Sequence, residues 1–429
     1  MLARIQECIL YRGFSNGEIL DDMTELINLY EADEEALKAR EDQFFKSVNG
    51  LVELAGMYGF SGNIWHTYLT FLLVNHENAF SMASEIRGAI KGSINDLAKN
   101  DFQIFKELYD FDITVFDKVF GTVCCRVICD YQTPDENRIR DRICQISKTL
   151  AAATTTEEFI DYMVSFYKDF GVGKLGLHKA FRIGHDEEGK VEIQPITRIA
   201  HVKIDDLVGY EIAKKKLIDN TEAFVQGRPA NNCLLFGDAG TGKSSSIKGI
   251  LNQYYDQGLR IIEAYKHQFK DLNDIIAQVK NRNYKFIIYM DDLSFEEFEI
   301  EYKYLKAVIE GGLEKKPDNI LIYATSNRRH LVREKFSDKE ERRDDLHSSD
   351  TVQEKLSLVA RFGVSIFFCA PDKKQFQNIV KTLAERHQVE MPEEELLLEA
   401  NKWELQHGGL SGRTAQQFID YLCGKNENK

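Results

Sequence analysis

Hydrophobic residues in the first part of the chain recur mostly at intervals of three and four positions. Leu26, Leu29 and Tyr30 follow this spacing, which places apolar side chains on one face of a helix. We therefore predict a mainly helical N-terminal domain over residues 1–196. A glycine-rich stretch followed by a β-like run at 190–196 indicates a junction at its end.

The pattern then changes to short, continuous apolar runs that alternate with amphipathic stretches. Continuous hydrophobicity is typical of strands buried on both faces, as in a parallel sheet covered by helices. The runs occupy residues 232–236, 260–264, 285–290, 319–324 and 364–369. We predict an α/β fold for residues 197–370, with an open parallel five-stranded sheet and helices on both faces. Amphipathic spacing resumes beyond Pro371 and predicts a C-terminal helical lid over residues 371–429.

Composition agrees with a globular protein of several domains. The chain has 429 residues, of which 43% are hydrophobic, and at about 150 residues per domain this length suggests two or three domains. The formal net charge is −14. That charge argues against a globally basic nucleic-acid binder, although it does not exclude a local basic patch.

The sequence also bears on compartment. The first residues contain no long apolar segment of a secretory signal, and the apolar stretch at 68–74 is far shorter than the roughly 18 residues that span a bilayer. We therefore expect a cytoplasmic protein with no membrane partner. The cluster of Cys124, Cys125 and Cys129 allows two interpretations, a metal site or thiols packed in the core, and the second is favoured because no C-x-x-C pair accompanies them.

Directly after the first apolar run stands the sequence GDAGTGKS, which matches G-x-x-x-x-G-K-[ST] between a predicted strand and a predicted helix. Glycines in such a loop let backbone N–H groups surround phosphate oxygens, and the lysine adds a positive charge to the β- and γ-phosphates. The serine hydroxyl offers a ligand for Mg²⁺. The residues predicted to bind ATP through this motif are Gly237, Asp238, Ala239, Gly240, Thr241, Gly242, Lys243, Ser244 and Ser245.

Two adjacent acids, Asp291 and Asp292, follow the apolar run at 285–290. An acid at the carboxyl end of a strand can bind Mg²⁺, and a second can orient the attacking water. We therefore assign Asp291, with Ser244, to the metal and Asp292 to the water. Two adjacent acids can also simply cap a following helix, which is the structural alternative.

Phosphate loop, acidic strand end and helical lid together resemble the AAA+ superfamily of ATPases over residues about 200 to 425. The resemblance implies that Val208 and Gly209, within DLVGY, line an adenine pocket. It also implies that Asn327 is the sensor-1 residue, which holds the attacking water against the γ-phosphate. An asparagine after a strand is also an ordinary turn residue.

Two arginines match further AAA+ positions. Arg361, in LSLVARFG, resembles the arginine finger that reaches into a neighbouring subunit, and Arg413, in GLSGRT, matches the sensor-2 residue that contacts phosphate from the same chain. A surface ion pair is the alternative for Arg361. The strings YMDDLSFEEF, LKAVIEGGL and IYATSNRRHL more specifically resemble the bacterial AAA+ family filed as domain of unknown function 815.

The resemblance implies an ATP-binding protein that hydrolyses ATP between subunits of a homo-oligomer, in a ring or open assembly, to remodel or regulate a partner. Many members carry Glu where Asp292 stands, and the shorter side chain suggests slow turnover. The N-terminal half is expected to recognise an unknown protein partner. The alternatives are a nucleotide-gated assembly module with little turnover and a helicase-loader-like DNA-associated factor, which the net charge of −14 does not support.

One further motif is expected to have no function. Residues 171–176 match G-x-G-x-x-G, the dinucleotide fingerprint, but neither a clear strand before it nor a helix after it is evident. We predict a glycine-rich connector.

Overall fold

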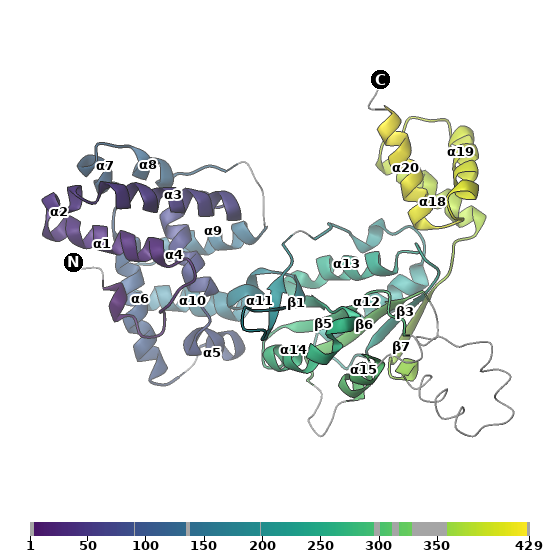
Figure 1. Cartoon of the computed structure of the whole chain (residues 1–429), viewed down its shortest axis with the longest axis horizontal. Helices are drawn as coiled ribbons and strands as arrows, with labels where there is room; N and C mark the ends of the chain where they lie inside the picture. The colour runs from purple at the N-terminus through teal and green to yellow at the C-terminus, as the bar shows by residue number, and fades with distance from the viewer. Residues whose placement is uncertain are drawn as a thin grey trace. The chain divides into compact units, whose positions relative to one another are not determined.

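The computed structural model describes residues 4–426, except for 90, 134–137, 198, 296–300, 311–316 and 328–357. Parts of the three strings that resemble family 815, at 296–298, 311–313 and 328–331, therefore lie outside the described residues. The chain divides into two compact units, Met1–His178 and Lys179–Lys429, whose elements are labelled in Figure 1.

The first unit is helical throughout its described part, which confirms the predicted helical N-terminal region. Its elements are η1 (Ile5–Glu7), α1 (Glu18–Ala32), α2 (Glu34–Lys38), α3 (Glu41–Tyr58), α4 (Ile64–Asn75), α5 (Ala79–Arg87), α6 (Ile94–Asp110), α7 (Val115–Val119), α8 (Cys124–Cys129), α9 (Arg138–Ala151), α10 (Thr156–Phe170) and α11 (Gly173–Leu177).

Helix α4 is the centre of this unit. Trp65 and every residue from Thr67 to Val74 are buried, so the helix is buried on nearly all sides, as expected of a helix inside a core. Asn63 caps its first turn by accepting a hydrogen bond from the His66 amide. The apolar stretch at 68–74 is thus the buried axis of the helical unit. None of the helices in the described part of the chain combines the length and hydrophobicity needed to cross a bilayer.

A buried carboxylate fixes the start of the chain to this core. Asp101 on α6 is fully buried, and it accepts hydrogen bonds from the backbone N–H groups of Ile9 (2.8 Å), Leu10 (2.6 Å) and Tyr11 (3.0 Å). Backbone donors that are buried need such partners. Asp101 therefore compensates three donors that would otherwise lie unsatisfied in the core.

The second unit is built on a seven-stranded sheet in the order β2-β1-β4-β5-β6-β3-β7. Its strands are β1 (Ala180–His185), β2 (Val191–Pro195), β3 (Cys233–Gly237), β4 (Leu259–Glu263), β5 (Lys285–Met290), β6 (Ile320–Ser326) and β7 (Val364–Phe368). The five predicted strands correspond to β3–β7, and all pairs among them are parallel. The predicted α/β fold is confirmed, but the predicted number of strands is wrong.

The two further strands form a hairpin at one edge of the sheet. β1 pairs antiparallel with β2 and parallel with β4. The hairpin lies in 180–195, within the range that the sequence assigns to the N-terminal domain ending at 196. The structure instead divides the chain between His178 and Lys179, because β1 extends the sheet of the second unit.

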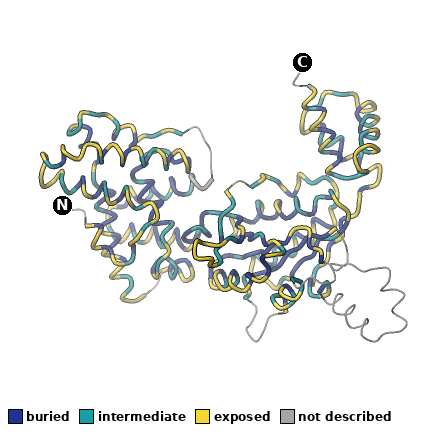
Figure 2. The backbone as a smooth tube through the Cα atoms, in the orientation of Figure 1, coloured by how far each residue is buried: buried dark blue, intermediate teal, exposed yellow. Residues whose placement is uncertain are grey.

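Helices cover both faces of the sheet, as Figure 1 shows, with α13 on one side and α14 and α15 on the other. Leu217 of α12 and Ile250 of α13 pack with Leu235 and Ile287 of the sheet in one buried cluster, and the strands β3–β6 are buried along most of their length (Figure 2). The helices before the lid are η2 (Ile204–Asp206), α12 (Glu211–Val225), α13 (Lys243–Tyr254), η3 (Tyr255–Gln257), η4 (Lys266–Asp271), α14 (Leu272–Val279) and α15 (Glu301–Glu310).

Three helices form the C-terminal lid: α18 (Lys373–Arg386), α19 (Glu393–Gln406) and α20 (Gly412–Asn426). Phe376, Leu396 and Phe418, one from each helix, share a hydrophobic cluster of their own. Asp372 begins α18 with a capping box, in which it accepts from the Gln375 amide while the Gln375 side chain accepts from the Asp372 amide. The lid helices thus hold together through their own core.

The Asp101 anchor predicts a large stability effect. Asp101→Ala should lower the free energy of unfolding by about 3 kcal/mol, because it leaves three buried backbone donors without an acceptor. Asp42→Ala, which removes an exposed acid paired with Lys46, should change it by less than about 0.5 kcal/mol. Urea unfolding of the full chain and hydrogen exchange at residues 9–11 would measure this, and equal stability of the two variants would contradict the anchor.

Candidate functional site

The phosphate loop lies where the sequence predicts it, between the end of β3 and the start of α13. Its first residue, Gly237, has φ +135°, and a Cβ atom there would clash with the carbonyl oxygen of Phe368 on β7. Gly240 has φ +73°, and a Cβ atom there would lie 2.9 Å from Ser411 Oγ. Glycine is required at both positions because β7 and the lid approach the loop so closely.

Asp238 ties the loop to the chain segment that leads into the lid. Its backbone N–H donates to the Phe368 carbonyl (3.0 Å), and its carboxylate accepts from the Ala370 amide at 2.7 Å. Gly237 and Asp238, both predicted to bind phosphate, instead contact the end of β7 and the segment after it. Neither of them lines the cavity beside the loop.

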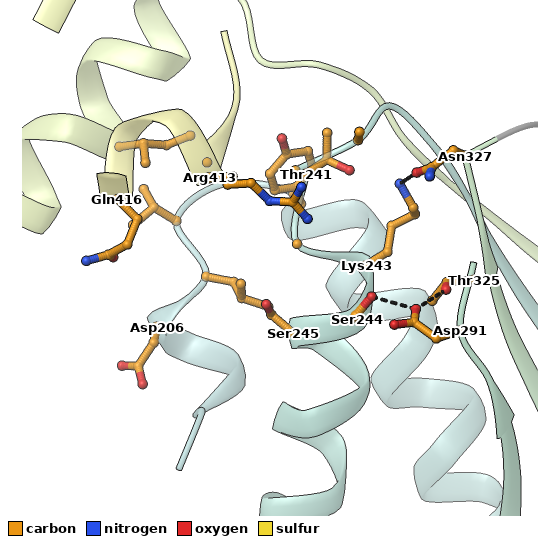
Figure 3. Close-up of a pocket in the computed structure, with 18 of the residues that line it drawn as sticks. Asp206, Thr241, Lys243, Ser244, Ser245, Asp291, Thr325, Asn327, Arg413 and Gln416 are labelled. Carbon is orange, nitrogen blue, oxygen red and sulfur yellow. Dashed lines mark hydrogen bonds between the residues drawn. The ribbon is translucent and has the colours of Figure 1, made fainter. Parts of the chain in front are cut away.

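Residues 239–245 of the loop line a cavity of about 610 Å³, which Figure 3 shows in close-up. The cavity thus contains the predicted residues Ala239, Gly240, Thr241, Gly242, Lys243, Ser244 and Ser245. The other polar lining comes from Asp206 of η2, from the carboxyl ends of β5 and β6 and from the lid. Such a crevice at the carboxyl ends of parallel strands is the usual ligand site of open α/β sheets.

Lys243 is buried at the base of this cavity. Its ammonium group donates to the carbonyl oxygens of Gly237 (2.9 Å) and Asp238 (2.6 Å) and to Asn327 Oδ1 at 3.1 Å. Burial lowers the pKa of Lys243, while the nearby carboxylates of Asp238, Asp292 and Asp291 act in the opposite direction. The loop, the lysine and the end of β6 are therefore directly connected.

Asp291 accepts three side-chain hydroxyls on one oxygen. The donors to its Oδ1 are Ser244 (2.8 Å), Tyr289 (2.6 Å) and Thr325 (2.5 Å), two of which are joined by dashed lines in Figure 3. Burial acts to raise the pKa of Asp291, but the bonds from Thr325, Tyr289 and Ser244 outweigh it, so the net pKa lies below its usual value. The carboxylate and the Ser244 hydroxyl are hard oxygen donors beside each other, a donor set that fits Mg²⁺.

Asp292 adopts an uncommon backbone conformation, with φ +48°. Its N–H donates to Thr325 Oγ1 (2.9 Å), and its carboxylate accepts from Asn327 Nδ2 at 2.7 Å. Because Asn327 also accepts from Lys243, this amide links the second acid to the phosphate loop. The predicted pair of Asp292 and Asn327 thus lies together at the cavity wall.

The lid closes one side of the cavity. Arg413 lines it, and its backbone N–H donates to the Gly240 carbonyl at 3.2 Å. Figure 3 shows the Arg413 side chain reaching from the lid toward Thr241. Arg413 therefore lies beside the phosphate loop of its own chain, where the sequence predicts it.

Residues before α12 complete the apolar end of the cavity. Val208 lines it with Leu207, Tyr210 and the lid residues Ile379 and Leu383. Gly209 instead lines an adjoining cavity of about 570 Å³ that shares Val208, Tyr210 and Ile379 with the first. Apolar walls beside a polar phosphate loop suit a flat base with a charged tail.

Arg361 does not line this cavity. It follows a helical turn at 358–360, and its guanidinium pairs with Glu310 at the end of α15. The ion pair that the sequence leaves open as an alternative is therefore formed, and the structure does not bring Arg361 together with the other predicted site residues of its own chain.

Several functional candidates were not predicted. Tyr289 and Thr325 donate to Asp291, and Ile379, Leu383 and Gln416 line the cavity from the lid. For Tyr289 a signal exists in the sequence, because residues two apart in a strand face the same side. The lid residues carry no comparable signal, since their position depends on how the lid packs.

The G-x-G-x-x-G match at 171–176 is not a nucleotide site. It follows helix α10 rather than a strand and runs into α11, and the buried carboxylate of Glu85 accepts a hydrogen bond from the Val172 amide at 2.9 Å. The predicted connector is therefore correct only for residues 171 and 172, because the remaining four residues of the match lie within α11.

The cysteine cluster is explained by packing and capping. Asp117, Cys124 and Cys125 offer ligand atoms within 4.8 Å of one another. The Asp117 carboxylate, however, accepts from the amides of Cys125 (2.9 Å) and Arg126 (3.0 Å) at the start of α8. Cys125 is buried, and burial raises the pKa of its thiol, as expected for a thiol packed in the core, whereas Cys124 and Cys129 are only partly buried.

The sheet order, the phosphate loop between β3 and α13, the paired acids after β5 and the helical lid define a P-loop protein of the AAA+ class. More particularly, the family model described as "Protein of unknown function (DUF815)" matches residues 177–426. This is more than half of the chain, and the chain belongs to that family.

Among curated proteins, the replication factor C large subunit of Staphylothermus marinus is 38% identical over 74 residues, which are 17% of this chain and 17% of that protein. Among solved structures, the Thermotoga maritima RuvB Holliday junction branch migration motor is 15% identical with a TM-score of 0.32, covering 51% of this chain and 71% of that one. A single-residue variant of the same RuvB gives 15% identity and a TM-score of 0.33 at the same coverage. These values are too low to transfer an activity.

The close approach of β3 and β7 predicts different costs for two glycine substitutions. Gly258→Ala, at φ +93° with open space around it, should cost about 1–2 kcal/mol of stability from backbone conformation alone. Gly237→Ala adds the clash with Phe368 and should cost about 3 kcal/mol or more. Thermal unfolding of both variants would compare them, and a similar loss in each would contradict the clash.

Proposed function

We propose that the chain is a Mg²⁺-dependent ATP-binding protein that hydrolyses ATP slowly. The observation that carries this proposal is the meeting of Lys243, Ser244, Asp291 and Asn327 around one cavity behind a phosphate loop. Residues 239–245 supply the backbone donors, and the apolar end around Val208 and Leu383 accepts the base. A nucleotide with its divalent cation combines the flat base, the phosphates and the metal that these three parts of the cavity suit.

The positive charges of the site indicate where the phosphates would bind. Lys243 exchanges its carbonyl partners for phosphate oxygens, and Arg413 supplies a second positive charge from the lid of the same chain. Asp291 and Ser244 would hold Mg²⁺, which when bound neutralises charge on the phosphates. Asp292 orients the water, and Asn327 senses the γ-phosphate through its amide.

We propose that Arg361 acts on a neighbouring copy in a homo-oligomer. Arg361 does not line the cavity of its own chain, as a residue acting in trans would not. Its pairing with Glu310 keeps the guanidinium at the end of α15, and assembly would exchange this acid for the phosphates of the next copy. The helical unit Met1–His178 would recognise the protein partner that turnover remodels or regulates.

A nucleotide-gated assembly module with little turnover is the second candidate. It is favoured by one contact, since the carboxylate of Asp292 accepts a bond from Asn327 at 2.7 Å, which engages one of the two oxygens that could polarise a water. The Holliday junction named for RuvB is not extended to this chain, because a net charge of −14 gives DNA binding no support.

Substitution of the lysine and the second acid separates binding from turnover. Lys243→Ala should weaken ATP binding by about 100-fold, equal to about 2.7 kcal/mol, because the buried charge is lost. Asp292→Asn should preserve binding and lower turnover by about 10²- to 10⁴-fold. Calorimetric ATP titration and phosphate release measure the two effects.

Lys248→Ala provides the matched control, because Lys248 is exposed on the same helix and does not line the cavity. It should bind and hydrolyse ATP like the wild type. Unchanged binding in Lys243→Ala would overturn the proposed function. If the wild-type protein binds ATP but does not hydrolyse it at any protein concentration, the slow ATPase is excluded and the nucleotide-gated assembly module is supported instead.

Mixing two inactive variants tests the trans role of Arg361. Arg361→Ala and Lys243→Ala should each lose turnover, whereas a mixture should regain part of it, since an intact loop on one copy meets an intact arginine on the next. Phosphate release is measured at several ratios of the two proteins. Full activity of Arg361→Ala alone would show that Arg361 only forms its ion pair.

A further inference from the structure

Tyr289 places a hydroxyl group inside the core directly on the acid predicted to bind metal. It is the next-to-last residue of β5, and Asp291 follows the last one, so the two side chains lie close together. Its ring is buried in the cluster that joins the sheet to α12 and α13, while its hydroxyl donates to Asp291 Oδ1 at 2.6 Å.

A second hydroxyl reaches the same oxygen from the neighbouring strand. Thr325 on β6 donates to Asp291 Oδ1 at 2.5 Å and accepts from the Asp292 amide at 2.9 Å. The parallel pairing of Met290 with Ala324 brings the two strand ends level. A carboxylate whose one oxygen is held from two strands cannot rotate without breaking a buried hydrogen bond.

We propose that Tyr289 is a positioning residue that, with Thr325, fixes the orientation of the Asp291 carboxylate for a divalent cation. The inference rests on the proposed function, since it concerns the same site. Ser244, the third donor, would itself bind the metal, whereas Tyr289 does not line the cavity and acts on the site only through the carboxylate. Donors behind a metal ligand commonly set metal affinity by about 10- to 100-fold.

The adjacent strand β6 carries a buried tyrosine, Tyr323, whose hydroxyl does not bond to Asp291. Tyr323 pairs directly with Tyr289 in the β5–β6 register and is buried in the same cluster. Its hydroxyl, however, bonds to Asn220 Nδ2 (2.9 Å) and Thr221 Oγ1 (3.0 Å) on α12. Removal of either hydroxyl leaves the ring in place, so the two tyrosine-to-phenylalanine variants differ mainly in whether the lost hydrogen bond ended on Asp291.

The test compares Tyr289→Phe with Tyr323→Phe in the full chain. Mn²⁺ binding in the presence of ADP is followed by electron paramagnetic resonance, and ADP affinity is measured separately without metal. Tyr289→Phe should weaken Mn²⁺ binding by about tenfold and leave metal-free ADP affinity unchanged, because the phosphate loop is untouched. In phosphate release, the Mg²⁺ concentration for half-maximal rate should rise, with kcat at saturating Mg²⁺ within about twofold of the wild type.

Thr325 provides a rescue. Thr325→Ser keeps the hydroxyl and should retain wild-type Mn²⁺ affinity, whereas Thr325→Val should lose it. Wild-type Mn²⁺ affinity in Tyr289→Phe, or an equal loss in Tyr323→Phe, would overturn the positioning role while the proposed function stands. Absence of ADP binding by the wild type would instead overturn the proposed function, and the inference with it.

Discussion

The parallel register of three strands is the constraint on which the site depends. β3 meets β6 at the pair Phe236 and Ser326, and β5 meets β6 at the pair Met290 and Ala324. The next residues along each strand therefore emerge at one edge of the sheet, where the loop lysine, the acids and the amide meet. A slip of β6 by one residue would turn Thr325 to the opposite face and remove its bond to Asp291.

Much of the candidate site could be predicted because its signals are local. The loop motif specifies its own conformation through glycine spacing, and paired acids after an apolar run indicate a strand end. The hydroxyl partners of Asp291 could not be found in this way, since Thr325 belongs to a different strand 34 residues away. Arg361 shows the same limit, because its pairing with Glu310 depends on where α15 ends.

The fold was predicted where burial on both faces produced a continuous apolar run. β1 and β2 were missed as members of the sheet because buried and partly exposed residues mix along each strand. β7, at the other edge, was found from its apolar run, although Ser365 and Phe367 are exposed. The two glycine motifs, at 237–244 and 171–176, differ in their structural context. Residues 171–176 satisfy a sequence pattern, but the helix α10 precedes them and Glu85 accepts from the Val172 amide, so the pattern without its strand does not specify a nucleotide site.

The lid leaves the phosphate loop and returns to it. Ala370, just before α18, is held by Asp238, and Arg413, at the start of α20, is held by the Gly240 carbonyl. The intervening helices share their own core. The lid is therefore hydrogen-bonded at both of its ends to phosphate-loop residues that lie two positions apart. Any rotation of the lid as a rigid body must break or distort at least one of these two hydrogen bonds. A movement of the lid therefore also pulls on the backbone of the phosphate loop.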